Sequence, residues 1–158
     1  LSGWECETFF FDTAALDDGY VRACSARPLP FDELLSTCDI VSLHVPLNRL
    51  THHLMGEREF ALMRPTVLFI NTCRGSVVDE GALIAALQNG QIAGAGLDVT
   101  DPEPIAPDNP LLHMANVAIT PHFAARAVQS GVHGSAHAAA NAARALRGET
   151  PLSIVQPV

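Results

Sequence analysis

Short apolar runs alternate along the chain with segments whose apolar residues recur at helical spacing. Apolar runs bounded by polar or turn residues are typical of buried strands, and a period close to the helical turn is typical of helices. We predict strands at 8–11, 20–24, 39–45, 67–71, 93–99 and 117–120, and helices at 30–35, 57–63, 79–89 and 124–146. Strands that are apolar throughout and alternate with helices indicate an α/β fold with a doubly wound parallel sheet.

The composition narrows the classes of protein to which this chain could belong. The 158 residues carry a net charge of −8, and all nine basic residues are arginines scattered along the sequence. Because no basic stripe is present to neutralise phosphates, neither nucleic acid nor an anionic membrane is the expected partner. Four cysteines without recurring spacing favour reduced thiols in a cytoplasmic protein. No apolar run approaches the length of a membrane span.

Polar side chains lie at or just beyond the carboxyl ends of several predicted strands. They are Asp12, His44, the run 71–74, Asp98 and His122, with Glu103 in the loop after Asp98. In open parallel sheets, ligands bind beyond the carboxyl ends of the strands, so these side chains are predicted to surround one crevice. Taken alone, Arg74 could be an ordinary surface arginine and His122 a core histidine. The prediction of a binding site therefore depends on all of these polar residues lying together at the strand ends.

Three stretches in order along the chain, "FINTCRGSVVDEGAL", "LDVTDPEP" and "ITPH", carry the motifs of a known family. Together with the upstream "FDELLSTCDIVSLHVPLNRLTHHLMG", they closely resemble the D-isomer-specific 2-hydroxyacid dehydrogenases. The resemblance covers essentially the whole chain. It implies a Rossmann-type NAD-binding domain and an oxidoreductase that interconverts a small D-2-hydroxy acid and a 2-oxo acid by hydride transfer.

The resemblance gives three residues a catalytic role. Arg74 matches the arginine of the family's N-x-x-R-G pattern, Glu103 the glutamate of D-V-x-x-x-E-P, and His122 the histidine of T-P-H. Arg74 would hold the substrate's carboxylate and carbonyl, a bidentate task that suits a planar guanidinium. His122 would be the general acid and base, and Glu103 would orient its imidazole.

The resemblance also implies a set of cofactor-binding residues. They are Asp12, His44, Pro46, Thr72, Cys73, Arg74, Asp98, His122 and Ala124. Asp12 would accept hydrogen bonds from the adenosine ribose, and its carboxylate would repel a 2′-phosphate, which favours NAD over NADP. Cys73 is equally well interpreted as a small side chain that only fills space in the packing, without contact to the cofactor. Ala124 stands where the family usually has glycine nearby, and its backbone N–H can still donate a hydrogen bond.

One family feature has no match in the sequence. The glycine-rich G-x-G-x-x-G loop is absent, and in the family it precedes the residue that matches Asp12 by some 20 residues. We therefore expect a Rossmann-type domain truncated at its N-terminus, without strand 1, and weak or no NAD binding by this chain alone. The expected organisation is an incomplete NAD-binding domain at 1–123 and a C-terminal helix and tail at 124–158 that return toward the substrate domain. A homodimer is expected for the full-length enzyme.

Two other functions stay open at this stage, and one kind of site is disfavoured. A non-catalytic, NAD(H)-sensing corepressor would resemble the dehydrogenases and could keep the same three residues. An inactive fragment is the other alternative, because the phosphate loop is missing. His133 and His137 have a spacing that can bind metal, but no HExxH glutamate accompanies them, so no metal site is predicted.

Overall fold

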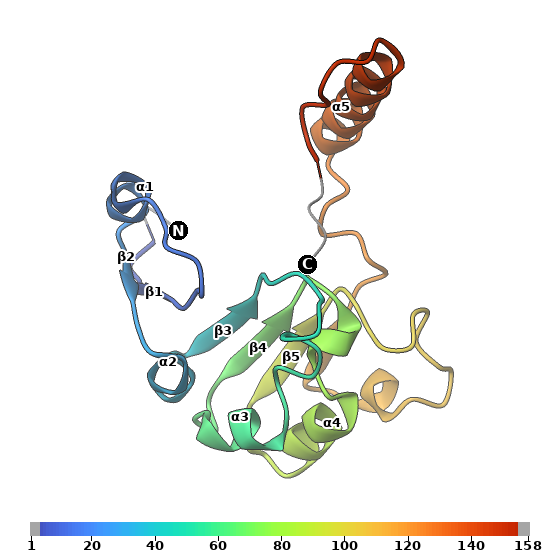
Figure 1. The fold of residues 1–158 in the computed structure, drawn as a ribbon. Coiled ribbons are helices and arrows are strands. Elements are labelled where there is room, and N and C mark those ends of the chain that lie inside the picture. The colour runs from blue at the N-terminus through green and yellow to red at the C-terminus, as the bar shows by residue number, and fades with distance from the viewer. Residues whose placement is uncertain (1–3, 155–158) are drawn as a thin grey trace. The chain divides into compact units, whose positions relative to one another are not determined.

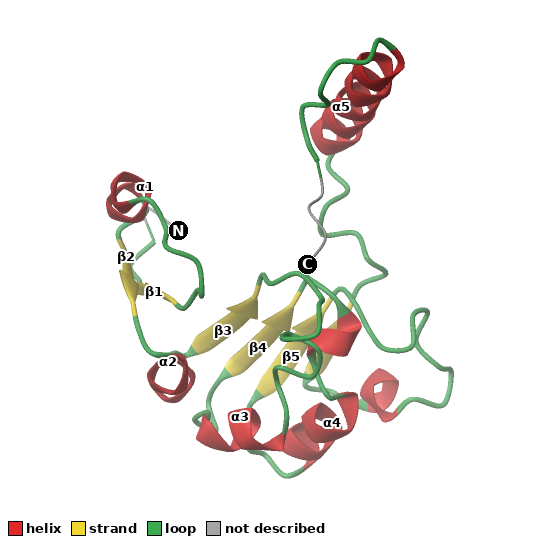
Figure 2. Cartoon of the chain, viewed as in Figure 1, coloured by secondary structure: helices red, strands yellow, loops and turns green. Residues whose placement is uncertain are grey.

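The computed structural model describes residues 4–154, and its secondary structure is that of an α/β protein (Figure 2). The chain divides into two compact units, Leu1–Pro121 and His122–Val158. The strands are β1 (Thr8–Phe10), β2 (Ala26–Pro28), β3 (Ile40–Leu43), β4 (Leu68–Asn71), β5 (Gly94–Leu97) and β6 (Val117–Ile119). The α-helices are α1 (Asp18–Ala23), α2 (Phe31–Thr37), α3 (Glu57–Leu62), α4 (Glu80–Gln88) and α5 (Val128–Leu146), with 3-10 helices η1 (Gly75–Val77) and η2 (Pro110–His113).

Four of the strands form a parallel sheet in the order β3-β4-β5-β6. The register pairs Leu43 with Asn71, Asn71 with Leu97, and Leu97 with Ile119. The carboxyl ends of the strands therefore coincide along one edge of the sheet. This arrangement confirms the predicted parallel α/β architecture.

The remaining two strands, β1 and β2, form a separate two-stranded parallel sheet. The strand predicted at 20–24 is wrong, because these residues belong mainly to helix α1 and strand β2 begins only at Ala26. The Asp17 side chain accepts a hydrogen bond from the backbone N–H of Tyr20 at 2.8 Å and so caps the helix. That capping signal outweighs the strand preference of tyrosine and valine.

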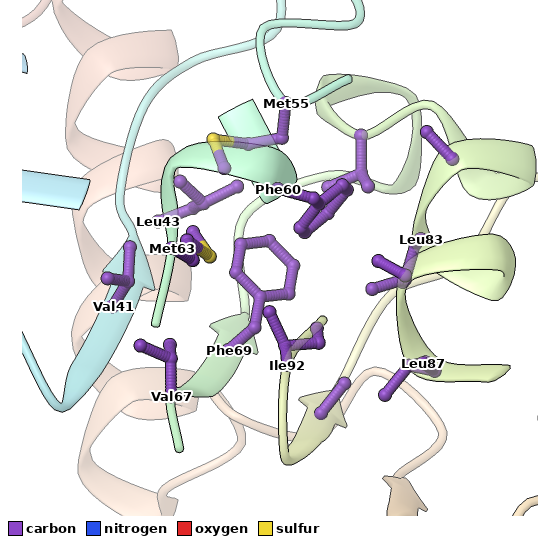
Figure 3. Packing of buried hydrophobic residues seen from close by; sticks show 14 of the residues in the cluster. Val41, Leu43, Met55, Phe60, Met63, Val67, Phe69, Leu83, Leu87 and Ile92 are labelled. Atoms are coloured by element: carbon purple, nitrogen blue, oxygen red, sulfur yellow. The ribbon is translucent and has the colours of Figure 1, made fainter. Parts of the chain in front are cut away.

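The core of the first unit lies between the four-stranded sheet and helices α3 and α4 (Figure 1). Phe69 of β4 is fully buried, and its ring meets that of Phe60 of α3 edge-on, with 5.3 Å between the ring centroids. Figure 3 shows Leu83 and Leu87 of α4 in the same cluster. Alternation along the strands turns Ile40 to the opposite face of the sheet, where its side chain is 62% exposed.

The second unit, His122–Val158, contains the helix α5. The helix was predicted from residue 124 and begins at Val128. Its polar side chains hold the following segment: Asn141 accepts from the backbone N–H of Leu152 at 2.6 Å, and His137 pairs with Ser153 at 2.7 Å. Among the described residues, no helix is both long enough and apolar enough to cross a membrane.

All four cysteines are free thiols. Cys6 and Cys24 are exposed, whereas Cys38 and Cys73 are half-buried. Burial raises the pKa of the Cys38 thiol, an effect that the positive charge of Arg64 opposes.

Removing the ring at the centre of the core should cost more stability than any surface truncation. We expect Phe69→Ala to lower the free energy of unfolding by about 3–5 kcal/mol, since it deletes a buried aromatic side chain and leaves a cavity. Leu50, which is 85% exposed, provides the control, and Leu50→Ala should change stability by less than about 0.5 kcal/mol. Urea denaturation of both variants measures the difference, and similar losses would contradict the assignment of the core.

Candidate active site

The site begins where β3, β4 and β5 end side by side. His44 follows β3, the run 72–74 follows β4, and Asp98 follows β5. The backbone N–H of Asp98 donates to the carbonyl oxygen of Asn71 at 2.9 Å, which joins the last two of these ends directly. The structure therefore brings the predicted polar residues of three strands to one edge of the sheet.

A buried asparagine shapes the turn that carries Arg74. Asn71 is only 1% exposed, and its side-chain amide donates to the carbonyl oxygen of Arg74 at 2.9 Å. Its side-chain oxygen accepts from the backbone N–H of Cys73 at 3.1 Å and from the Cys73 thiol at 3.0 Å. With these bonds the asparagine side chain is satisfied by the turn itself, so the backbone of Arg74 is held at a defined place.

Arg74 presents its guanidinium to solvent. Its backbone is extended, with φ −151° and ψ 144°, and Nη1 donates to the carbonyl oxygen of Cys73 at 2.6 Å. None of the ion pairs found within residues 4–154 involves Arg74. Its cation is thus not neutralised by a neighbouring carboxylate of the described chain.

A hollow lies beside this turn. Its lining consists of Val45, Pro46, Leu47, Thr72, Cys73 and Arg74. Four of these residues, Pro46, Thr72, Cys73 and Arg74, are among the predicted cofactor-binding residues. The hollow is apolar on the β3 side and polar on the β4 side, which suits a ligand with a flat ring and a charged group.

His44 and Asp98 lie at the neighbouring strand ends with different degrees of burial. His44 is exposed, and its Nε2 lies 2.9 Å from the Ser42 hydroxyl. Asp98 is 5% exposed, and the Thr120 hydroxyl donates to its carboxylate. A buried carboxylate needs such donors, because burying an unpaired charge is costly.

Glu103 lies in the loop that follows β5, which we call the Glu103 loop (residues 100–109). Its side chain is exposed. The loop passes directly over the Arg74 turn: a Cβ built on Gly75 would lie 2.0 Å from the carbonyl oxygen of Thr100. Arg74 and the Glu103 loop are therefore held against each other through the backbone of the next residue, Gly75.

The other predicted residues lie elsewhere in the chain. Asp12 follows β1, in the two-stranded sheet, and its carboxylate accepts from the backbone N–H of Ala14 at 2.8 Å. His122 and Ala124 belong to the second unit. His122 has a positive φ of 57°, a backbone conformation that residues other than glycine adopt rarely. The predicted catalytic residues thus come from both units.

Sequence reasoning placed Asn71 at the strand end, in the run 71–74, but did not predict that it holds the turn. The close backbone approach at Gly75 was not predicted either, although a glycine next to the arginine of the N-x-x-R-G pattern was a usable signal for it. Ser76 and Glu80 gave no such signal, because an isolated polar residue in a loop or at a helix start is ordinary. Within residues 4–154, no three side chains of His, Cys, Asp and Glu gather as a metal site would require.

Known proteins with similar sequences include reductases named for glyoxylate and hydroxypyruvate. The chain is 39% identical over 153 residues to the glyoxylate reductase of Korarchaeum cryptofilum, covering 97% of this chain and 46% of the relative. It is 47% identical over 133 residues to the glyoxylate/hydroxypyruvate reductase B of Shigella boydii, covering 84% of this chain and 41% of the relative. The chain thus spans less than half the length of these relatives.

Solved structures lead to the same family. The holo form of Rhodotorula graminis D-mandelate dehydrogenase superposes with a TM-score of 0.88 at 34% identity, over 96% of this chain and 44% of that one. An acyclic imino acid reductase in complex with NADPH and D-Arg superposes with a TM-score of 0.84 at 28% identity, over 95% and 46%. The model of the D-isomer-specific 2-hydroxyacid dehydrogenase NAD-binding domain matches residues 1–124. The chain therefore belongs to the D-isomer-specific 2-hydroxyacid dehydrogenases, and its fold is Rossmann-like.

The asparagine beneath the arginine turn can be tested by its removal. Asn71→Ala leaves the carbonyl of Arg74 and the N–H of Cys73 without their buried partner, so we expect the free energy of unfolding to fall by about 1–3 kcal/mol. Asn116→Ala is the matched control, because it also removes an asparagine hydrogen bond to a backbone carbonyl, but an exposed one. Urea denaturation measures the free energy of unfolding of both variants, and an equal loss in the two would show that Asn71 does not support the turn.

Proposed function

We propose that this chain is the cofactor-binding half of an NAD-dependent enzyme that interconverts a D-2-hydroxy acid and a 2-oxo acid. The observation that carries the proposal is the exposed, unneutralised cation of Arg74, held by a buried asparagine at the edge of a hollow at the sheet's carboxyl end. Membership of the family and its reductase relatives support the reaction class.

Arg74 supplies the recognition of the acid. A planar guanidinium donates two parallel hydrogen bonds to a carboxylate, and a further N–H can reach the adjacent carbonyl oxygen. Because its backbone is fixed at Asn71, the fork starts from a defined point and loses less entropy on binding. Two-carbon and three-carbon 2-oxo acids present these groups side by side, which fits a single arginine.

His122 and Glu103 supply the proton chemistry in this proposal. His122 gives a proton to the carbonyl oxygen during reduction and removes it from the hydroxyl during oxidation. Glu103 accepts a hydrogen bond from the imidazole and so orients it toward the substrate. A bound nicotinamide dinucleotide supplies the hydride in the reduction.

The proposed cofactor site uses residues on both sheets. The hollow beside Arg74, with Pro46, Thr72 and Cys73, suits the nicotinamide end, and Asp98 and His44 lie at the neighbouring strand ends. Asp12 would accept from the ribose hydroxyls, and its negative charge favours NAD over NADP. Homodimeric assembly and a cytoplasmic location remain predictions that follow from the family resemblance.

The reaction class is tested with the longer polypeptide that carries these residues. NADH oxidation is followed with glyoxylate, hydroxypyruvate and pyruvate, and we expect turnover with at least one of them and a lower rate with NADPH. NADH binding without turnover of any 2-oxo acid would contradict the proposal and favour a sensing role.

The role of Arg74 is tested in the same polypeptide. Arg74→Lys keeps the charge but not the planar fork, so we expect kcat/KM for the oxo acid to fall by on the order of 100-fold. Arg49→Lys is the matched control, since Arg49 is an exposed arginine in the loop after β3. Activity of Arg74→Lys close to that of Arg49→Lys would exclude the recognition role.

A further inference from the structure

The segment Gly75–Glu80 contacts both ends of the Glu103 loop. It follows Arg74 directly and comprises η1 and the start of α4. The loop leaves β5 at one end and enters η2 at the other. Each end meets this segment through a side-chain hydrogen bond, and the two bonds have different surroundings.

At the first end, backbone packing and a hydrogen bond act together. Gly75 lies under Thr100 and Asp101 so closely that a Cβ on Gly75 would be 2.7 Å from the backbone nitrogen of Asp101. Beside this contact, the Ser76 hydroxyl donates to the carboxylate of Asp101. This end of the loop is fixed within two residues of Glu103.

At the second end, the contact is partly buried. The side-chain amide of Asn109 donates to the carboxylate of Glu80 at 2.6 Å, and Asn109 is only 7% exposed. The side-chain oxygen of Asn109 accepts from the backbone N–H of Leu111 at 2.9 Å. A charge-assisted bond to a buried amide holds position better than one between two exposed side chains.

The segment itself is fixed from its other side. The backbone of 53–55 pairs with it: His53 N–H donates to Ser76 at 2.9 Å, Met55 N–H donates to Val77 at 3.1 Å, and Asp79 N–H donates to Met55 at 2.9 Å. Met55 and Val77 are both fully buried. The segment is therefore a support anchored in the core.

We propose that Ser76 and Glu80 are positioning residues, which clamp the Glu103 loop at Asp101 and Asn109 and so set the place of Glu103 relative to Arg74. The inference rests on the proposed function for its catalytic meaning. Arg74 precedes the segment and Glu103 lies between the two anchors, so one rigid piece of chain sets the spacing between the acid-recognition group and the carboxylate proposed to orient the imidazole. Loosening either anchor spreads Glu103 over several positions without touching Arg74.

The experiment compares Ser76→Ala, Glu80→Ala and their double variant in the longer polypeptide. Hydrogen exchange reports the mobility of residues 101–109, and steady-state kinetics report turnover. We expect faster exchange in this loop and a loss of kcat of roughly fivefold for each single variant, larger for the double variant, with an unchanged dissociation constant for NADH. Glu80→Gln keeps an acceptor oxygen for Asn109 and should restore most of kcat.

Glu57→Ala is the matched control, because Glu57 also opens a helix and is exposed. It should leave exchange of 101–109 and kcat as in the wild type. Unchanged loop exchange in Ser76→Ala and Glu80→Ala would overturn the clamp, and faster exchange with unchanged kcat would overturn its positioning role. Absence of turnover by the wild type would overturn the proposed function and the catalytic meaning of the clamp, while exchange would still decide whether these side chains hold the loop.

Discussion

The site depends on one steric constraint, the passage of Thr100 and Asp101 over Gly75. A side chain at position 75 would overlap the backbone of the Glu103 loop, with a Cβ only 2.0 Å from the Thr100 carbonyl oxygen. Glycine is therefore required here by the close approach of the two backbones and not by a positive φ. Because the two backbones are in contact at this point, the loop after β4 and the loop after β5 are fixed relative to each other. The hydrogen bonds of Ser76 and Glu80 add two further contacts between the segment Gly75–Glu80 and the Glu103 loop.

The constraint is supported by the core through the two-residue period of β4. Phe69 and Asn71 point to the same face of the sheet, so the side chain above the fully buried phenylalanine is also buried. A buried amide must find partners, and Asn71 finds them in Cys73 and Arg74. The hydrophobic packing under the sheet thereby determines the conformation of a polar turn on its edge.

The sequence predicted those features that depend on local pattern. β3 to β6 lie within the predicted ranges, because each is an apolar run that ends at polar residues. The strand at 20–24 was wrong, since the Asp17 cap favours a helix in a segment whose tyrosine and valine favour a strand. The start of α5 was placed four residues too early at 124 rather than 128, because alanine gives no sign of where a helix begins. Contacts such as Glu80 with Asn109 join residues distant in sequence, and no local pattern reveals them.

The charge pattern explains why Arg74 is suited to bind an acid. In a chain with 17 acidic and nine basic residues, a surface arginine readily finds a carboxylate. Ion pairs of this kind occupy Arg27, Arg58, Arg64, Arg144 and Arg147. Arg74, like Arg22 and Arg49, forms none within residues 4–154, and the hydrogen bond of its guanidinium goes to the carbonyl oxygen of its own neighbour, Cys73. An exposed, unpaired guanidinium on a fixed backbone is useful as a recognition element, because the binding of an anion then replaces only water and one local hydrogen bond.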